Sequence, residues 1–214
     1  PETIYGITNL WVRKDANYMK IKMDGEVYYV SEYAVEKLKI QDHEIEILEK
    51  LNGEYFIGKE VLNEYVNKKI NIINAEFVDP TNATGLVMSV PAHAPFDYVA
   101  LVTAIGKIEA DKIVKPVIKS DKELGEIPAR TIVEQMNITD LKDEKLEEAT
   151  KIIYRKELLN GTMIEGEFKD LKVEIAREKL KEKLLNDKKA IILHEILNRP
   201  VKCRCGGLVE VKIF

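Results

Sequence analysis

The stretch 83–98 constrains the fold most, because it predicts a strand, a short loop and a helix in immediate succession. An apolar run is typical of a buried strand, and Pro91 ends it because proline cannot donate a hydrogen bond to a neighbouring strand. Pro95 and Asp97 then favour the first turn of a helix. His93 and Asp97 therefore flank the start of that helix, either at the mouth of a pocket or, for the aspartate, as a simple helix cap.

Turn signals at short intervals mark the first 120 residues. Asp24-Gly25, between two strand-like runs, is a strong hairpin signal, and residues 3–12 are also typical of a strand. Such a succession of short strands favours a barrel or a sandwich. Further strand-like runs occupy residues 45–48, 55–57, 70–78 and 113–118.

Apolar residues recur at helical spacing after residue 120. The predicted helices are 127–136, 143–159 and 171–186, and strand patterns return at 191–196 and 209–213. In the second helix the predicted buried face carries Leu146, Ala149, Ile153 and Leu158. The Lys and Glu residues on the opposite faces are typical of solvated surface.

These patterns predict an α+β fold with a small β-barrel and peripheral helices. Residues 1–120 and 190–214 are expected to form the barrel core, and residues 121–189 a mainly helical insertion. Both ends of the chain carry strand patterns, so we expect one domain, residues 1–214, cut from a longer chain. The termini of such an inserted domain should lie close together.

Composition excludes some classes of partner. The 214 residues are 45% hydrophobic and carry a formal net charge of −4, so no global positive field attracts nucleic acid. The chain has two cysteines, no signal peptide and no long apolar segment. We therefore expect a cytoplasmic protein that does not contact a membrane, and an isolated domain that is a monomer.

Two other motifs suggest chemistry that we weigh as alternatives. Cys203 and Cys205 resemble half of a zinc knuckle, but zinc pairs are usually spaced by two or more residues and need two further ligands. We therefore predict no metal there, with a metal site as the alternative. Ser89 and His93 lack the strained elbow motif of a serine nucleophile, so a buried or lining serine is favoured.

Residues 1–12 and the stretch 83–98 together resemble two motifs of the leucyl-tRNA synthetase editing domain. The first is similar to its threonine-rich opening segment, and the second to the Gly-Thr-Gly strand that leads to its editing-site aspartate. The match is nearest to the archaeal and eukaryotic branch, whose helical insertion residues 125–186 resemble. The Cys203 segment resembles the return into the catalytic domain of that synthetase. The departures are Ala83 in place of a glycine, and Ala94 and Phe96 in place of Asp and Arg.

The resemblance implies roles for individual residues. Asp97 would bind the α-ammonium group of the substrate, Thr3 would shape the side-chain pocket, and His93 would orient water or the ribose. No covalent nucleophile is required, because holding water in line with an activated ester supplies much of the rate. The catalytic candidates are thus Asp97 and His93, and the candidates for substrate binding are Thr3, Thr84, Gly85, Met88, Ser89, Val90 and Tyr98.

The implied reaction is hydrolysis of isoleucyl-, norvalyl-, methionyl- or similar mischarged tRNA(Leu), with leucyl-tRNA spared. Editing would need no cofactor, whereas the parent synthetase would use ATP and Mg. The expected partners are the 3′ end of tRNA(Leu) and the rest of the synthetase chain. Two alternatives stay open: a non-catalytic tRNA-binding or docking insertion, and an isoleucyl- or valyl-type editing domain.

Overall fold

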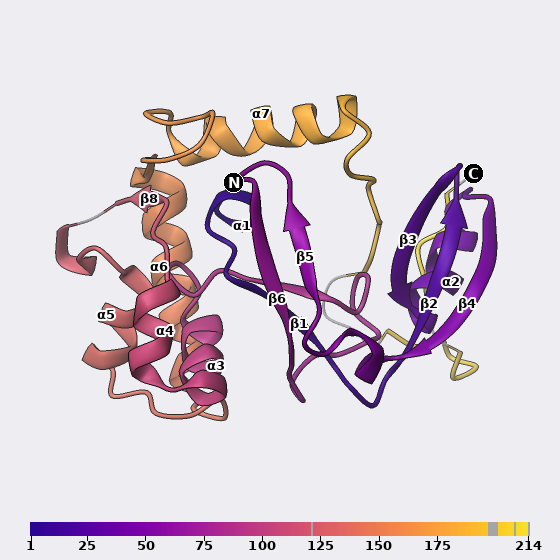
Figure 1. Ribbon diagram of the computed structural model, residues 1–214, viewed down its shortest axis with the longest axis horizontal. Helices are drawn as coiled ribbons and strands as arrows, with labels where there is room; N and C mark the ends of the chain where they lie inside the picture. Colours follow the sequence, from indigo (N-terminus) through magenta and orange to yellow (C-terminus); the bar gives the residue numbers. More distant parts are fainter. Residues whose placement is uncertain (121, 197–200, 208, 214) are drawn as a thin grey trace. The chain divides into compact units, whose positions relative to one another are not determined.

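The computed structural model describes residues 1–120, 122–196, 201–207 and 209–213 (Figure 1). The chain divides into two compact units. The first contains Pro1–Leu10, Glu60–Asn71 and Met88–Ala190, and the second contains Trp11–Lys59, Ile72–Val87 and Ile191–Phe214. Phe214, on which the expected proximity of the termini depends, lies outside the described residues.

The first unit holds most of the helices. They are α1 (Glu2–Tyr5), α3 (Pro95–Ile105), α4 (Lys107–Ile113), α5 (Pro128–Gln135), α6 (Lys145–Asn160) and α7 (Val173–Asn186), with the short 3₁₀ helix η2 (Lys122–Leu124). Helices α3, α5 and α6 pack around one apolar cluster, and α4 packs against α3 (Figure 1). A second cluster joins α1, α7 and the two-stranded sheet of β8 (Ile118–Lys119) and β9 (Thr162–Met163).

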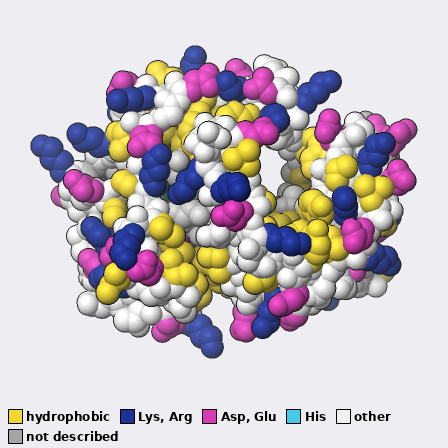
Figure 2. Space-filling model, viewed as in Figure 1, with side chains coloured by type: hydrophobic (Ala, Val, Ile, Leu, Met, Phe, Trp, Pro, Cys, Tyr) yellow, Lys and Arg dark blue, Asp and Glu magenta, His cyan; other side chains and the backbone are white. Residues whose placement is uncertain are grey.

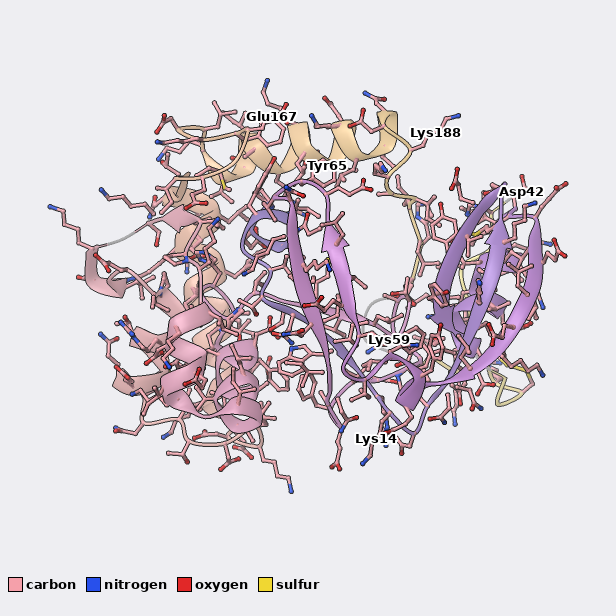
Figure 3. The ribbon with its side chains drawn as sticks, in the orientation of Figure 1. Lys14, Asp42, Lys59, Tyr65, Glu167 and Lys188 are labelled. Carbon is pink, nitrogen blue, oxygen red and sulfur yellow. A yellow bond between two sulfur atoms is a disulfide. The ribbon has the colours of Figure 1, made fainter. Side chains whose placement is uncertain are left out.

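Four further strands form one sheet in the order β5-β6-β1-β7. Their bounds are β5 (Glu60–Asn63), β6 (Lys68–Asn74), β1 (Asn9–Val12) and β7 (Val87–Ser89). Tyr65 lies in the turn between β5 and β6 (Figure 3). Of this sheet, β7 leads directly into the loop that precedes α3.

The second unit is built on an antiparallel sheet in the order β3-β2-β4. Its elements are β2 (Asn17–Met23), β3 (Glu26–Ser31), α2 (Glu32–Lys39), β4 (Ile45–Asn52) and the 3₁₀ helix η1 (Gly53–Phe56). The predicted hairpin is confirmed, because Asp24 and Gly25 form the turn with φ values of 51° and 93°. Apolar side chains of α2 cover this sheet.

The long predicted helices are confirmed, because α5, α6 and α7 begin and end within two residues of their expected bounds. The strand predicted over residues 3–12 is wrong in its first part. Residues Glu2–Tyr5 form α1, and only Asn9–Val12 is a strand. Pro1 accepts the N–H groups of Ile4 and Tyr5, and over so few residues the apolar pattern does not separate helix from strand.

Other short predictions also change. Residues 55–57 were expected as a strand, but η1 covers most of them. Of residues 113–118, only the last belongs to a strand. Residues 191–196 and 209–213 have neither helix nor strand. In the second segment the backbone makes single hydrogen bonds, from Val209 to the Val201 carbonyl and from Ile213 to the Ile40 carbonyl. Leu208 and Phe214, which flank the second of these segments, lie outside the described residues.

The surface is highly charged but mixed in sign. On the face shown in Figure 2, Lys and Arg side chains alternate with Asp and Glu. Many of them pair, as Lys183 does with Glu167, labelled in Figure 3, at 2.7 Å. Among the described residues, no helix combines the length and apolar character needed to cross a membrane.

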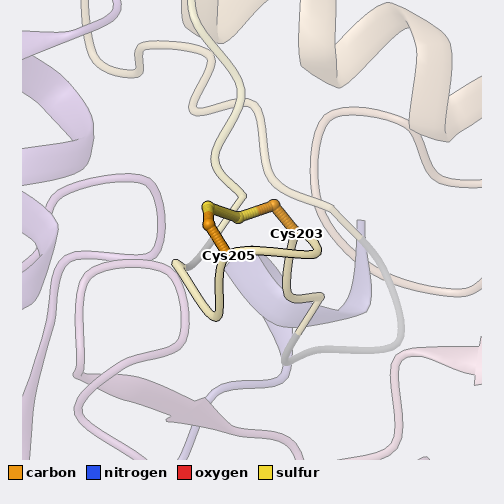
Figure 4. Close-up of a disulfide and its surroundings, with 2 residues drawn as sticks. All are labelled: Cys203 and Cys205. Atoms are coloured by element: carbon orange, nitrogen blue, oxygen red, sulfur yellow. A yellow bond between two sulfur atoms is a disulfide. The ribbon is translucent and has the colours of Figure 1, made fainter.

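Cys203 and Cys205 are joined by a disulfide (Figure 4). In this form neither sulfur is a thiolate, which is the species that binds metal. The described residues contain no group of three or more His, Cys, Asp or Glu placed to hold a metal ion.

Candidate functional site

Asp97 is the third residue of α3 and is tied to the end of the preceding strand. Its Oδ2 accepts the backbone N–H of Val90 at 2.8 Å, and the residue is 8% exposed. The free N–H groups in the first turn of a helix favour a negative charge there. Asp97 is therefore a buried carboxylate whose position relative to β7 is fixed by a hydrogen bond.

His93 lies in the loop between β7 and α3 and is 6% exposed. Its Nε2 accepts the backbone N–H of Val117 at 2.9 Å, and its Nδ1 lies 2.7 Å from Glu157 Oε1. Because Nε2 is an acceptor, the proton belongs on Nδ1, which donates to Glu157. Both ring nitrogens thus have partners inside the protein, and the expected contact of His93 with water or ribose stays a prediction.

The surroundings of Glu157 disfavour its ionised form. Burial raises the pKa of this carboxyl group above its ordinary value, the negative charge of Glu2 adds to that effect, and the hydrogen bond with His93 opposes it. Glu2 precedes Thr3 in α1. The opening segment and the His93 loop therefore lie within electrostatic reach of one another.

A second contact brings the same two segments together. A Cβ atom added to Gly6 would lie 3.1 Å from Val117 Cγ2, so α1 ends against the residue whose N–H binds His93. Thr3 is half-buried in α1. Thr3, His93 and Asp97, three of the residues that the two motifs predicted, all belong to the first unit.

The strand residues differ in their exposure. Met88 is 44% exposed, Val90 is buried and Ser89 is fully buried. The Ser89 carbonyl accepts the N–H of Thr8 at 3.0 Å, whereas its hydroxyl has no hydrogen-bond partner among the described residues. Ser89 and His93 therefore do not form a nucleophile–base pair.

Tyr98 lies in the apolar cluster of α3, α5 and α6 and is almost fully buried. Its hydroxyl donates to Asp111 Oδ1 at 2.9 Å, and burial together with Asp111 raises its pKa. This geometry favours a structural role over the predicted part in substrate binding.

We expect Tyr98→Phe to lower the free energy of unfolding by about 1–2 kcal/mol, because one hydrogen bond to a carboxylate is lost. Hydrolysis of mischarged tRNA should be unchanged. Denaturant titration and a deacylation assay measure the two effects, and a raised KM for the tRNA would restore Tyr98 to the substrate site.

Thr84 and Gly85 belong to the second unit, where their backbone is firmly held. The N–H of Ser31 donates to the Thr84 carbonyl at 2.8 Å, and the Tyr18 hydroxyl donates to the Gly85 carbonyl at 2.8 Å. Gly85 has a φ of 76°, and a Cβ atom there would lie 2.6 Å from Ser31 Cβ. Only glycine fits this position without displacing its neighbours.

A partly buried ion pair holds the turn before Thr84. Lys37 donates to the carbonyl oxygens of Thr81 (2.6 Å) and Ala83 (3.3 Å) and pairs with Glu195. Glu195 in turn accepts the N–H of Ala83, with its two oxygens at 3.0 and 3.1 Å. Ala83 has a φ of 43°, a left-handed conformation that glycine adopts more readily.

Replacing Ala83 with glycine should therefore raise the free energy of unfolding by about 0.5–1 kcal/mol. Ala104, which is exposed in α3, is a matched control, because Ala104→Gly removes a good helix former and should lower stability by a similar amount. Urea denaturation measures both variants. Equal losses in the two variants would contradict the assignment of strain to Ala83.

The sequence patterns missed two buried charged residues, Glu157 in the first unit and Lys37 in the second. The predicted buried face of the second long helix ended at Leu158, but Leu158 is only half-buried and Glu157 is buried. Ile153 and Glu157 are four residues apart on one face of α6. In the sequence, Glu157 occupies the same helical face as the apolar Ile153. That placement of a charged residue is the pattern that could have indicated a buried hydrogen-bonded group.

The comparisons with known proteins agree with one another. A sequence profile of the family described as "Leucyl-tRNA synthetase, editing domain" matches residues 1–158. The chain is 38% identical to a leucine–tRNA ligase of Archaeoglobus fulgidus and 40% identical to one of Staphylothermus marinus. Each alignment covers 100% of this chain and 24% of the relative, so the chain spans about a quarter of the length of these curated relatives.

Solved structures share the fold. The crystal structure titled GlLeuRS-CP1 superposes with a TM-score of 0.78 at 25% identity, covering 92% of this chain and 81% of that chain. The editing domain of the cytosolic leucyl-tRNA synthetase of P. falciparum gives a TM-score of 0.76 at 20% identity, with coverages of 91% and 77%. The predicted α+β editing-domain fold is confirmed, while closure of its strands into a barrel stays a prediction. The chain therefore belongs to the family of leucyl-tRNA synthetase editing domains, the hydrolytic proofreading domains of that synthetase.

Proposed function

We propose that this domain hydrolyses mischarged aminoacyl-tRNA(Leu), carrying isoleucine, norvaline, methionine or similar residues, and spares leucyl-tRNA(Leu). One methylene group distinguishes apolar side chains by only about 1–3 kcal/mol, so a synthetic pocket alone leaks errors. A second pocket that accepts the wrong residues and excludes leucine removes them. The partner would be the 3′ end of tRNA(Leu), presented by the rest of a cytoplasmic synthetase.

The observation that carries the proposal is the buried carboxylate of Asp97, fixed at the start of α3 by the N–H of Val90. A carboxylate held in this way can bind the α-ammonium group of an aminoacyl ester through a charge-assisted hydrogen bond. Thr3 and Asp97 belong to the same unit, and the N–H of Thr8 donates to the Ser89 carbonyl at 3.0 Å, which supports a common site for the two motifs. Retention of this acidic anchor also argues against a domain that only docks tRNA.

The remaining residues take supporting roles in this proposal. Thr3 forms the wall that senses side-chain branching, and Met88 and Val90 of the same unit line the pocket. The predicted contribution of the Thr84-Gly85 backbone, which belongs to the second unit, stays a prediction. Water attacks the ester directly, because Ser89 and His93 are not paired. Editing then proceeds without a cofactor, and ATP and Mg serve only aminoacylation by the parent enzyme. We also propose that residues 1–120 and 190–214 form the core of one domain, with residues 121–189 as its helical insertion.

A deacylation assay with the full-length protein tests this function. Isoleucyl-, norvalyl- and methionyl-tRNA(Leu) should be hydrolysed, and leucyl-tRNA(Leu) should remain intact. Valyl-tRNA(Ile) identifies the isoleucyl-type alternative, since only a site of that type would hydrolyse valyl-tRNA(Ile) faster than isoleucyl-tRNA(Leu). If no mischarged tRNA is hydrolysed above the rate in buffer, the docking alternative replaces this proposal.

A further inference from the structure

Glu157 is a buried carboxylate on a helix whose other acidic residues are exposed. It is 6% exposed, whereas Glu147 and Glu148 on the same helix face solvent. Removing a carboxylate from water is unfavourable unless hydrogen bonds replace its hydration. Such a residue, placed among apolar neighbours of α6, needs a specific partner.

That partner is His93, 64 positions away in the chain. Glu157 Oε1 lies 2.7 Å from His93 Nδ1, and the N–H of Val117 donates to His93 Nε2 at 2.9 Å. These two contacts permit only the tautomer that carries its proton on Nδ1. The N–H of Val117 makes Nε2 the hydrogen-bond acceptor of the ring. Glu157 then accepts the hydrogen bond that the protonated Nδ1 donates.

The loop that carries His93 is held at a further point by the helices. The N–H of Ala129, in the first turn of α5, donates to the carbonyl of Ala92 at 3.0 Å. Ala92 is fully buried. Both α5 and α6 therefore anchor residues that follow Pro91 in the motif.

Val90 is hydrogen-bonded to both His93 and Asp97. The N–H groups of His93 and Ala94 both donate to the Val90 carbonyl, at 2.9 and 3.0 Å. The N–H of Val90 donates to Asp97 Oδ2 at 2.8 Å. The backbone of Val90 therefore contacts both the residue that carries the His93 ring and the Asp97 carboxylate.

We propose that Glu157 is a positioning residue of the editing site, which holds the His93 ring in one tautomer and thereby fixes the loop that orients Asp97. The inference rests on the proposed function, because it assigns Glu157 to the same hydrolysis. It gives the helical segment a role in the chemistry, since α6 supplies a group that the motif loop requires. The contribution of Glu157 is a correctly placed acceptor, so a neutral acceptor of the same shape should replace it.

The test uses the full-length protein and isoleucyl-tRNA(Leu). In Glu157→Ala, kcat should fall about tenfold to a hundredfold with KM changed less than about threefold, because misplacement of a catalytic group lowers the rate of the bound complex. In Glu157→Gln, whose side-chain oxygen still accepts from Nδ1, kcat should stay within about threefold of the parent. Glu148→Ala, an exposed change on the same helix, should leave both parameters unchanged.

A shorter acid covers the case in which Glu157→Ala does not fold. Glu157→Asp keeps the charge but withdraws the acceptor by one methylene, so it should be folded and show a reduced kcat. Parental kcat in a folded Glu157→Ala, or in Glu157→Asp if the alanine variant does not fold, would overturn the inference. Equal losses of kcat in Glu157→Gln and Glu157→Ala would also overturn it, because the negative charge itself would then be required.

The two proposals fail in different ways. If the parent does not hydrolyse isoleucyl-tRNA(Leu) faster than Asp97→Asn does, the proposed function is wrong. If the parent does, and a folded Glu157→Ala matches it, or Glu157→Asp does where the alanine variant does not fold, only the role of Glu157 is wrong.

Discussion

Asp97→Asn should abolish most hydrolysis of isoleucyl-tRNA(Leu) while the protein stays folded. The amide oxygen of asparagine can still accept the N–H of Val90, so the hydrogen bond at 2.8 Å has a replacement. The charge that binds the substrate ammonium is lost. A charged hydrogen bond is worth about 1.5–3 kcal/mol, which corresponds to about one to two orders of magnitude in rate.

Asp97→Ala separates the two functions of this carboxylate. The alanine leaves the N–H of Val90 without its partner, which should lower the free energy of unfolding by a further ~1–3 kcal/mol. Hydrolysis should fall at least as far as in the asparagine variant. Deacylation under single-turnover conditions and denaturant titration measure the two quantities, with aminoacylation as the control for the rest of the protein. Parental hydrolysis by a folded Asp97→Asn would show that the anchor lies elsewhere.

Thr3→Ala should create hydrolysis of leucyl-tRNA(Leu) and largely retain hydrolysis of isoleucyl-tRNA(Leu). Leucine branches at Cγ, isoleucine branches at Cβ and norvaline is unbranched. The stiff β-branched side chain of Thr3 can therefore clash with one Cδ methyl group of leucine and still accommodate isoleucine and norvaline. Relief of a methyl-sized clash is worth about 1–3 kcal/mol, or about tenfold to a hundredfold in rate. The half-buried position of Thr3 in α1 allows this change without opening the apolar core.

Thr3→Val is the matched control, because valine keeps the branched shape and removes only the hydroxyl. We expect it to reject leucine as the parent does. Thr150→Ala, on exposed α6 surface, controls for the loss of any threonine. Intact leucyl-tRNA(Leu) in the presence of Thr3→Ala would return Thr3 to a structural role. If Thr3→Val hydrolyses leucyl-tRNA(Leu) and Thr3→Ala does not, the hydroxyl group of Thr3 is what excludes leucine.

Sequence patterns were sufficient where local preferences extend over many residues. The helices α5, α6 and α7 follow from apolar spacing sustained over several turns, and the β2–β3 hairpin follows from Asp24-Gly25. The position of Asp97 in the first turn of α3 follows from strand, proline and helix signals that meet within a few residues, whereas its role in binding was implied only by the family resemblance. In each case the determining interactions lie close together in the chain, so the sequence displays them directly.

Tertiary structure decided the features that depend on distant partners. Residues 2–5 carry the residue types of a strand but form α1, where Tyr5 packs edge-on against Phe168 with ring centroids 6.4 Å apart. Glu157 resembles the exposed glutamates around it until His93 is placed opposite, and Lys37 resembles the other lysines until Thr81, Ala83 and Glu195 surround it. Amino-acid type alone does not distinguish a solvated charge from a buried one. The distinction depends on which hydrogen-bond partners the fold delivers from far along the chain, because those partners replace the water that a buried charge loses.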